Sequence, residues 1–296
     1  MNCEKSKYGW MIYNEGKGPN SFGFDTFTWM KEAAAKYDIE LDVITIDKIS
    51  LFMSSGESVL YFDGKKMRKP DFAVVRAYNY ELGYFLESID IPVINSTESM
   101  YISRNKILTA ELLNKYNIPT PKIVYKNYNY DIIVKLLGEK FVLKAVTGSK
   151  GENIFLVENR NMFSKIIDYF LLNEIDFFAQ EFIETSYGKD IRVYTLGDEV
   201  LGGVIRYSDD DFRSNYSLGG NYKYFELNEE IINLSKKIVK VTNLEFSGLD
   251  ILFTQNGYTV CEINGNAGYQ TISSVSDIDM ADKLYQYISN RIYKNA

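Results

Sequence analysis

The sequence contains no histidine in its 296 residues. That absence excludes the Ser-His-Asp and Cys-His nucleophile arrangements, histidine metal sites and the commonest general base of enzymes. Any chemistry must therefore rest on carboxylates, cations and metal-bound phosphate.

Cysteine is nearly absent as well, since the chain has only Cys3 and Cys261. Two thiols supply neither a disulfide framework nor a thiolate zinc site, and reduced thiols fit the cytosol. No apolar run approaches the roughly 20 residues that span a bilayer, and the first residues lack the apolar segment of about 7 or more residues that marks a secretory signal. We expect a cytoplasmic protein with no membrane partner.

Positive charge is in deficit: 33 Lys and Arg residues stand against 40 Asp and Glu residues, which gives a formal net charge of −7. This balance argues against a nucleic-acid binder and favours a small or cationic partner. The composition, 46% hydrophobic and 25% charged, is that of an ordinary soluble protein. The length suggests two or three subdomains.

Short apolar runs alternate with helical patterns from Tyr8 to Asn95. This order predicts a small α/β layer with a mainly parallel sheet, which we assign to residues 1–98. A helix is predicted from Ser103 to Tyr116, with Ser103 able to cap it, and two prolines, Pro119 and Pro121, end it.

The rest of the chain divides into two further predicted parts. Residues 99–184 would hold the linker helix and a central subdomain of strands and one helix, and residues 185–296 a C-terminal subdomain. The latter contains two strands joined at Gly197 and Asp198, a helix, a hairpin and a closing helix. The fold class predicted for the whole is α/β (α+β).

The segment "DILFTQNGYTVCEINGN", Asp250 to Asn266, reads as a hydrophobic hairpin that nevertheless carries two carboxylates and an amide. Side chains two apart on a strand point the same way. Glu262 and Asn264 should therefore share one face, while Cys261 and Ile263 face the core.

The turn decides whether Asp250 joins Glu262. With a two-residue loop at Asn256 and Gly257, Asp250 would face away from Glu262. With a three-residue loop that also includes Gln255, Asp250 would lie directly across from Glu262.

We expect the three-residue loop, in which Thr254 opposes Tyr258 and Gly257 adopts a positive φ. Oxygen ligands on one face, with no histidine or thiolate, describe a hard-cation site for magnesium or manganese. The ligands would be Asp250, Glu262 and Asn264. The alternative is an edge hairpin whose carboxylates are merely solvated.

The loop "TGSKG", Thr147 to Gly151, lies between two predicted strands, so it is not a Walker phosphate loop, which joins a strand to a helix. Gly148 and Gly151 would let backbone amides approach phosphates, and Lys144 and Lys150 would add charge. An ordinary β-turn is the competing interpretation.

Two further segments carry groups that suit nucleotides or anions. In "AQEFIE", backbone groups of Phe182 and Ile183 could read an adenine edge; the plainer interpretation is an edge strand. In "DIRVY", Asp190 and Arg192 share one face, and arginine forks match two oxygens at once. Three more candidate anion contacts follow: Arg206, Arg213 and Asn215. For any one of them, a surface salt bridge is the plainer interpretation.

The chain resembles the ATP-grasp superfamily, and specifically the RimK-like α-L-glutamate ligases, in seven segments taken in order: "SRNK", "FVLK", "TGSKG", "QEFI", "DIRVYTLGDEVLGG", "FRSNYSLGG" and "LDILFTQNGYTVCEINGNAG". The likeness runs from about Pro70 to Ile272. It implies an ATP-grasp fold with an N-terminal Rossmann-like pre-ATP-grasp domain, a central lid domain and a C-terminal ATP-grasp domain. It also implies an ADP-forming ligase, in which ATP phosphorylates a carboxylate and an amine then attacks the acyl phosphate.

The resemblance implies roles for individual residues. The nucleotide-binding positions would be Lys106, Lys144, Gly148, Ser149, Lys150, Gly151, Glu181, Phe182, Ile183 and, for the ribose, Asp190. Asp250, Glu262 and Asn264 would hold magnesium or manganese, two ions in all. The catalytic candidates, which would face the transferred phosphate and the acyl group, are Arg213, Asn215, Arg192 and Arg206.

Two departures from the family pattern lie where the substrates would sit. Leu218 stands where a basic residue is frequent, and "EINGNAG" stands where E-x-N-x-x-P-G is usual. They leave open which amino acid is added. The expected partners are ATP, an amino acid or amine, and a carboxylate-bearing peptide, protein or small molecule; a homo-oligomer is left open. The alternatives are a ligase that forms crosslinks in a ribosomal peptide and a nucleotide-binding regulator without turnover.

Overall fold

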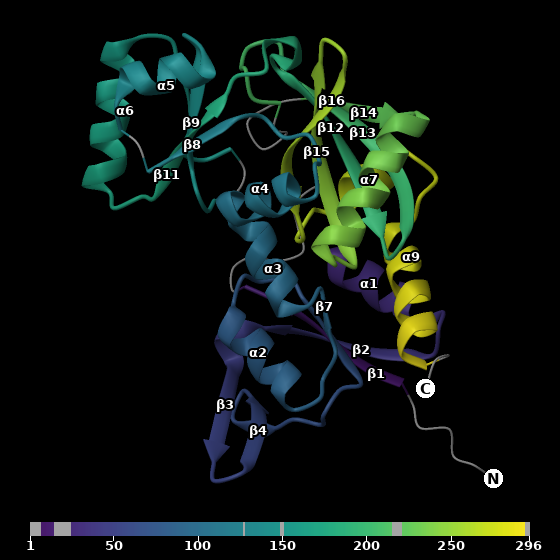
Figure 1. Ribbon diagram of the computed structural model, residues 1–296. Helices are drawn as coiled ribbons and strands as arrows, with labels where there is room; N and C mark the ends of the chain where they lie inside the picture. The colour runs from purple at the N-terminus through teal and green to yellow at the C-terminus, as the bar shows by residue number, and fades with distance from the viewer. Residues whose placement is uncertain (1–6, 15–24, 127, 149–150, 215–220, 294–296) are drawn as a thin grey trace, which may run out of the picture. The chain divides into compact units, whose positions relative to one another are not determined.

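The structure is a computed structural model that describes residues 7–14, 25–126, 128–148, 151–214 and 221–293. The chain divides into two compact units. Figure 1 colours their helices and strands by residue number. Unit 1 comprises Met1–Tyr101, Leu244–Phe246 and Gly268–Ala296, and unit 2 comprises Ile102–Asn243 and Ser247–Ala267. The finer division into three parts, 1–98, 99–184 and 185–296, stays a prediction.

Unit 1 contains a four-stranded parallel sheet, as the alternation of apolar runs predicted. The strands are, in order across the sheet, β2 (Ile39–Thr45), β1 (Lys7–Tyr13), β6 (Phe72–Val75) and β7 (Val93–Ile94). The helices are α1 (Thr26–Ala35), α2 (Tyr80–Ser88), α8 (Gln270–Ser273) and α9 (Met280–Ile288), and α3 (Thr97–Arg104) begins in this unit. A small antiparallel sheet adds β3 (Ile49–Ser54), β4 (Glu57–Phe62) and β5 (Lys65–Lys66).

Both faces of strand β1 are buried, as is usual for a parallel sheet. Trp10 and Ile12 belong to the same apolar cluster as Leu82 and Leu86 of α2. Met11 points to the opposite face because side chains alternate along a strand, and its sulfur accepts a hydrogen bond from the Tyr285 hydroxyl of α9. The strand therefore holds helices on both sides of the sheet.

Unit 2 contains two sheets. The first, which we call the lid sheet, is antiparallel with the order β10 (Ile154–Val157), β9 (Phe141–Ala145), β11 (Phe177–Glu181) and β8 (Ile123–Tyr125). Helices α5 (Tyr130–Leu137) and α6 (Arg160–Leu172) lie on one side of it (Figure 1). Phe177 and Ala179 of β11 join the cluster that these helices bury. Phe178 and Gln180 therefore lie on the opposite face of the lid sheet.

The second sheet of unit 2 has five strands in the order β14 (Asn221–Phe225), β13 (Glu199–Tyr207), β12 (Lys189–Leu196), β15 (Phe246–Thr254) and β16 (Gly257–Asn264). Helix α7 (Glu229–Thr242) packs against β12 and β13, and α4 (Lys106–Lys115) contacts α7 and β16. Short non-α turns occur at Ile46–Lys48, Glu184–Ser186 and Ser289–Tyr293. In the described part of the chain, no helix is long and apolar enough to cross a membrane.

The helix predicted from Ser103 to Tyr116 is in fact two helices. Helix α3 ends at Arg104, and α4 begins at Lys106. The predicted cap was wrong, because Ser103 lies inside α3 and the side chain of Asn105 accepts hydrogen bonds from the first amides of α4. The break places Lys106 at the start of a helix, where its amide donates to the carbonyl of Val146 beside the lid sheet.

Candidate active site

A pocket in unit 2 is lined by both of its sheets. The lid sheet contributes Lys144, whose cross-strand neighbour is Phe178, so its side chain shares the face of the lid sheet that points away from α5 and α6. Lys144 is only 8% exposed. Its Nζ lies 3.4 Å from the Sγ of Cys261. Among the described residues no carboxylate forms an ion pair with Lys144, so its buried charge suits an anionic ligand.

The β15–β16 hairpin forms another wall of this pocket, and its register differs from the predicted one. Thr254 opposes Gly257 rather than Tyr258, so the loop has two residues, Gln255 and Asn256. The prediction of a three-residue loop was wrong. The positive φ expected for Gly257 is present, at 137°.

Asp250 nevertheless lies directly across from Glu262, as predicted, because a β-bulge shifts the register at this point. Ile251 opposes Val260, and Cys261 is the extra residue on β16. The bulge places Cys261 beside Glu262 in the pocket wall, so the prediction that Cys261 faces the core was wrong. Ile263 is buried, as expected.

Asp250 is 5% exposed and is held by two arginines. Arg192 donates to both carboxylate oxygens, from Nε and from Nη2, at 2.7 Å each. The Nη2 of Arg206 lies 2.9 Å from one of them. Burial alone would raise the pKa of Asp250, but the two guanidinium groups outweigh burial and lower the pKa to about 2. Asp250 is therefore ionised at neutral pH.

Asp190 is the second carboxylate of this arginine network. It is 6% exposed, and its cross-strand partner on β13 is Arg206. Arg206 Nε donates to Asp190 Oδ1 at 2.7 Å, and Nη2 donates to the other oxygen. Burial tends to lower the pKa of Arg206, but Asp190 and Asp250 raise it well above its usual value. Whether Asp190 also holds a ribose stays a prediction.

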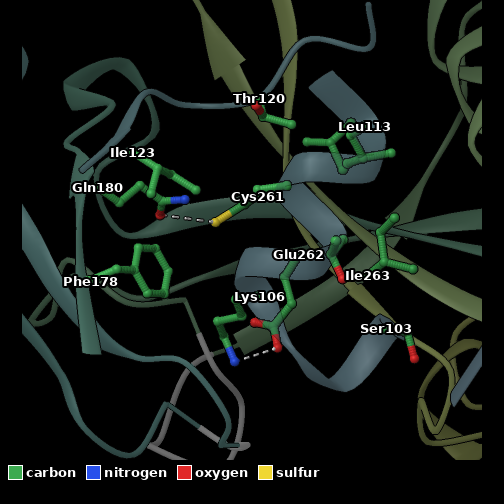
Figure 2. Close-up of a pocket in the computed structure, with 13 residues that line it drawn as sticks. Ser103, Lys106, Leu113, Thr120, Ile123, Phe178, Gln180, Cys261, Glu262 and Ile263 are labelled. Carbon is green, nitrogen blue, oxygen red and sulfur yellow. Dashed lines mark hydrogen bonds and ion pairs between the residues drawn. The ribbon is translucent and has the colours of Figure 1, made fainter. Parts of the chain in front are cut away.

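Glu262 is paired with a lysine. Its Oε1 lies 3.3 Å from Lys106 Nζ, and the two side chains point toward one another in Figure 2. Further along the strand, the side-chain oxygen of Asn264 accepts a hydrogen bond from the amide of Asn266 at 2.8 Å.

The donor set fits magnesium or manganese. Asp250 and Glu262 are cross-strand neighbours that line one pocket and offer oxygen atoms alone. Within the described residues, no group of three or more Asp, Glu, Cys or His side chains is placed so that its members alone could hold a metal ion. A metal ion held here would therefore need oxygen ligands from elsewhere, and phosphate and water are the natural ones.

The segment expected to read adenine borders the same pocket. Phe182 and Ile183 line it, directly after strand β11. Glu181 donates its amide to the carbonyl of Lys122, and its carboxylate forms an ion pair with the side chain of Lys122. The carbonyl of Ile183 accepts from the amide of Ser186. These bonds fix the path of the backbone beside the pocket.

The glycine loop of the lid sheet is described only at its two ends. The carbonyl of Gly148 accepts from Arg104 at 2.6 Å, and the carbonyl of Gly151 accepts from Arg213 at 3.0 Å. Arg213 also donates to the carboxylate of Asp211. Gly151 has a φ of 77°, where glycine is favoured. The remaining predicted members, Ser149, Lys150 and Asn215, lie outside the described residues.

Two residues of the pocket were missed by the sequence interpretation. Gln180, which is 4% exposed, accepts a hydrogen bond from the thiol of Cys261 (Figure 2), and both residues line the pocket. Burial raises the pKa of Cys261, although Lys144 opposes this effect. The thiol therefore stays neutral and does not compensate the charge of Lys144. Gln180 could have been found from the sequence, because it is a polar side chain in an otherwise apolar strand. Cys261 could not, because only the β-bulge places it in the pocket wall.

The sequence was compared with models of protein families and with known proteins. The model of the RimK-like ATP-grasp domain matches residues 103–288. The chain is similar to a probable α-L-glutamate ligase of Rhodopirellula baltica, with 27% identity over 88% of this chain and 67% of the relative. It is also similar to the tetrahydromethanopterin:α-L-glutamate ligase of Methanocaldococcus jannaschii, with 29% identity over 87% of this chain and 92% of the relative.

Two solved structures share the fold. One is the ATP-grasp ligase PsnB complexed with a minimal precursor, with a TM-score of 0.73 and 17% identity, covering 96% of this chain and 99% of that one. The other is the D-alanine–D-alanine ligase of Bacillus anthracis complexed with ATP, with a TM-score of 0.70 and 16% identity, covering 98% and 99%. At these identities the likeness concerns the fold alone.

Proposed function

Because this chain belongs to the RimK-like ATP-grasp family, we propose that it adds an amino acid, such as glutamate, to a carboxylate-bearing acceptor. It is an ATP-dependent, ADP-forming ligase that joins an acid to an amino acid through an amide bond. The identity of the acceptor, whether a peptide, a protein or a small molecule, belongs to the proposal.

One observation carries the proposal: a lysine and two carboxylates line the same pocket without forming an ion pair with one another. Lys144 has no carboxylate partner in the described part of the chain, whereas Asp250 and Glu262 stand opposite each other on the hairpin. A pocket that offers a cation on one wall and paired carboxylates on another suits a polyphosphate with its metal ion.

The proposed chemistry runs in two steps. The terminal phosphoryl group of ATP passes to a carboxylate oxygen of the acceptor, which gives an acyl phosphate and ADP. The amino group of the second substrate then attacks the acyl carbon, phosphate leaves, and an amide forms. This route needs no histidine, because phosphorylation makes the carboxylate electrophilic and cations carry the negative charge.

We assign the metal to Asp250, Glu262 and Asn264, and propose two magnesium or manganese ions. The metal would neutralise phosphate charge as it develops. Lys106 and Lys144 would hold phosphate oxygens, and the backbone of Glu181, Phe182 and Ile183 would read the adenine. Arg213 and Asn215, with Arg192 and Arg206, would face the transferred phosphate and the acyl group.

Glutamate is proposed as the added amino acid because the two curated relatives described above are named α-L-glutamate ligases. The segment "EINGNAG" departs from the family pattern next to the metal hairpin. A side chain other than glutamate could therefore be accepted. A panel of amino acids supplied with ATP and a candidate acceptor would decide this point.

The test is a trapping experiment. The protein is incubated with ATP, magnesium and each candidate acceptor, and ADP release is measured with hydroxylamine present to capture an acyl phosphate as a hydroxamate. The hydroxamate should form only with a true acceptor, and an amino acid should replace it with an amide product. Lys144→Met should abolish both products, whereas Lys140→Met, which removes an exposed lysine paired with Glu158 away from the pocket, should not. ADP release that is independent of any acceptor, with no trapped product, would contradict the proposal.

A further inference from the structure

Each carboxylate of the candidate metal pair is already bound to a cation of the chain itself. Asp250 receives three hydrogen bonds or ion contacts, two from Arg192 and one from Arg206. Glu262 lies 3.3 Å from Lys106 (Figure 2). Three of the cations assigned above to the nucleotide and the acyl phosphate thus rest on carboxylates assigned to the metal.

The charges in this group balance. Three carboxylates, Asp190, Asp250 and Glu262, face three cations, Arg192, Arg206 and Lys106. A divalent ion that entered this neutral group would place two uncompensated positive charges next to partly or fully buried arginines. Such charges are costly in a desolvated site. The metal therefore has to displace the resident cations, and these need another anion to bind.

Phosphate is the anion that suits all three. A guanidinium fork matches two phosphate oxygens as well as it matches a carboxylate, and a lysine ammonium binds phosphate as a point charge. Lys144, which has no carboxylate partner among the described residues, is in place to attract a polyphosphate into the pocket before any exchange takes place.

We propose that Arg192, Arg206 and Lys106 are exchangeable counter-ions: they neutralise Asp250 and Glu262 in the metal-free protein, and they transfer to phosphate when nucleotide and metal enter together. This inference rests on the proposed function, because it requires the pocket to bind a metal–nucleotide complex. It gives the arginines a role before substrates arrive.

The two arginines are held differently, which predicts how each one moves. Arg206 bonds to Asp190 through both Nε and Nη2, so it can release Asp250 and keep a buried partner. Arg192 has Asp250 as its carboxylate partner, and no second carboxylate among the described residues bonds to it. Arg192 must therefore leave Asp250 for phosphate, while Arg206 pivots on Asp190. Asp190 is thus a positioning residue for Arg206.

The exchange couples metal binding to nucleotide binding. Metal alone should bind weakly, because it competes with the resident cations. Nucleotide should tighten metal binding by roughly 5- to 150-fold, the usual range for coupled sites, and metal should tighten nucleotide binding by the same factor.

The test measures manganese binding from the paramagnetic signal of the free ion, with and without a non-hydrolysable ATP analogue, after subtraction of manganese bound by the analogue in solution. In the unaltered protein the analogue should tighten binding by the factor above. In Arg192→Met, manganese alone should bind at least fivefold more tightly, and the effect of the analogue should shrink. Arg192→Lys keeps the positive charge but loses the two-pronged guanidinium, so its affinity for manganese alone should lie between those of the unaltered protein and Arg192→Met. Arg160→Met is the control: it removes one positive charge from an exposed ion pair with Asp131 on the lid helices. It should bind manganese, with and without the analogue, as tightly as the unaltered protein does.

A second variant covers the case in which Arg192→Met does not fold. Lys106→Gln frees Glu262 without touching the arginine network, and it should raise the affinity for manganese alone in the same direction. The exchange is refuted if manganese binds equally well with and without the analogue, or if neither variant strengthens binding of the metal alone. If the unaltered protein binds no manganese even with the analogue, the proposed metal–nucleotide function fails as well, and the two failures are thereby told apart.

Discussion

The two sheets of unit 2 present opposite electrostatic faces to the same pocket. The lid sheet offers Lys144, a single buried cation beside a neutral thiol. The five-stranded sheet offers a closed network in which Asp190 and Asp250 alternate with two arginines. Lys144 can bind an anion without breaking an ion pair among the described residues, whereas the carboxylates of the five-stranded sheet must first release the arginines that hold them. Under the proposed function, the lid sheet would attract the nucleotide, and the five-stranded sheet would bind the metal once its ion pairs open.

Breaking the network at Asp250 should have the largest effect. Asp250→Asn leaves two buried guanidinium groups facing a neutral amide, so the free energy of unfolding should fall by about 3 kcal/mol, and magnesium-dependent turnover should fall by orders of magnitude. Two neighbouring carboxylates repel each other, so the loss of one charge would by itself relieve repulsion; the arginines that hold Asp250 reverse the sign of the effect. Denaturant unfolding and ADP release would measure the two effects.

Glu262→Gln is the comparison for that variant. The Glu262 side chain is partly exposed and is held by Lys106. The variant should lose turnover to a similar degree but keep most of its stability. Equal stability losses in the two variants would show that the arginine network is not the source of the difference.

Acid should weaken the same network by a smaller amount. The pKa of Asp250 is lowered from 3.8 to about 2, so the folded state binds a proton less readily than the unfolded state does. The resulting stabilisation, about 2 kcal/mol, is complete above the unfolded pKa of about 4 and is lost as the pH falls toward 2. The difference in unfolding free energy between the unaltered protein and Asp250→Asn should be constant from pH 5 to pH 7 and should shrink below pH 4. A difference that grows on acidification would contradict the sign of this shift.

Removing the cation of the lid sheet should affect binding more than folding. Lys144→Met deletes a buried charge that has no carboxylate partner among the described residues, so the free energy of unfolding should stay the same or rise. Affinity for an ATP analogue should fall at least tenfold, or about 1.4 kcal/mol. Calorimetric titration of the analogue would measure the affinity, and thermal unfolding would measure the stability. A less stable protein with unchanged affinity would assign Lys144 a structural role instead.

The smallest predicted effect concerns Gly257, at the tip of the β15–β16 hairpin. Gly257 has a φ of 137°, and a Cβ there would lie 2.6 Å from the carboxylate of Glu230. Gly257→Val should therefore cost about 1 kcal/mol or more in unfolding free energy and should also lower turnover. Gly56→Val is a matched control: Gly56 has a φ of 87° and open space around it, in the turn of another hairpin, so it should lose stability without losing turnover. Full turnover in Gly257→Val would show that the conformation of the hairpin tip does not affect the site.

Much of the site could be predicted from side-chain chemistry in sequence order. The hairpin carboxylates, Lys144 and the segment after β11 do line one pocket, and the family follows from the order of the motifs. The absence of histidine narrowed the chemistry before any geometry was known. The sequence could predict contacts between residues that are close in the chain, and it could predict which side chains share a face of a strand, because side chains alternate along a strand.

The pairing of the arginines was not accessible from the sequence. Asp190 and Arg206 meet because β12 and β13 align in one register, and a shift of a single residue would separate them. Likewise the bulge at Cys261 has no glycine or proline to announce it. Its only sequence trace is that Asp250 and Glu262, polar residues in apolar strands, would fall on opposite faces of a regular hairpin with a two-residue loop.

The bulge also sets how the hairpin tolerates changes in length. An odd number of residues, 251 to 261, separates Asp250 from Glu262, and strand pairing consumes residues two at a time. The surplus residue resides at present in the strand, as Cys261. It could equally reside in the loop, as a three-residue turn with no bulge. Deletion of Cys261 would leave a regular hairpin with the two-residue loop and would still bring the two carboxylates face to face. Natural variants of this hairpin that differ by one residue are therefore compatible with the same arrangement of acids, and length alone is no guide to whether the site has been lost.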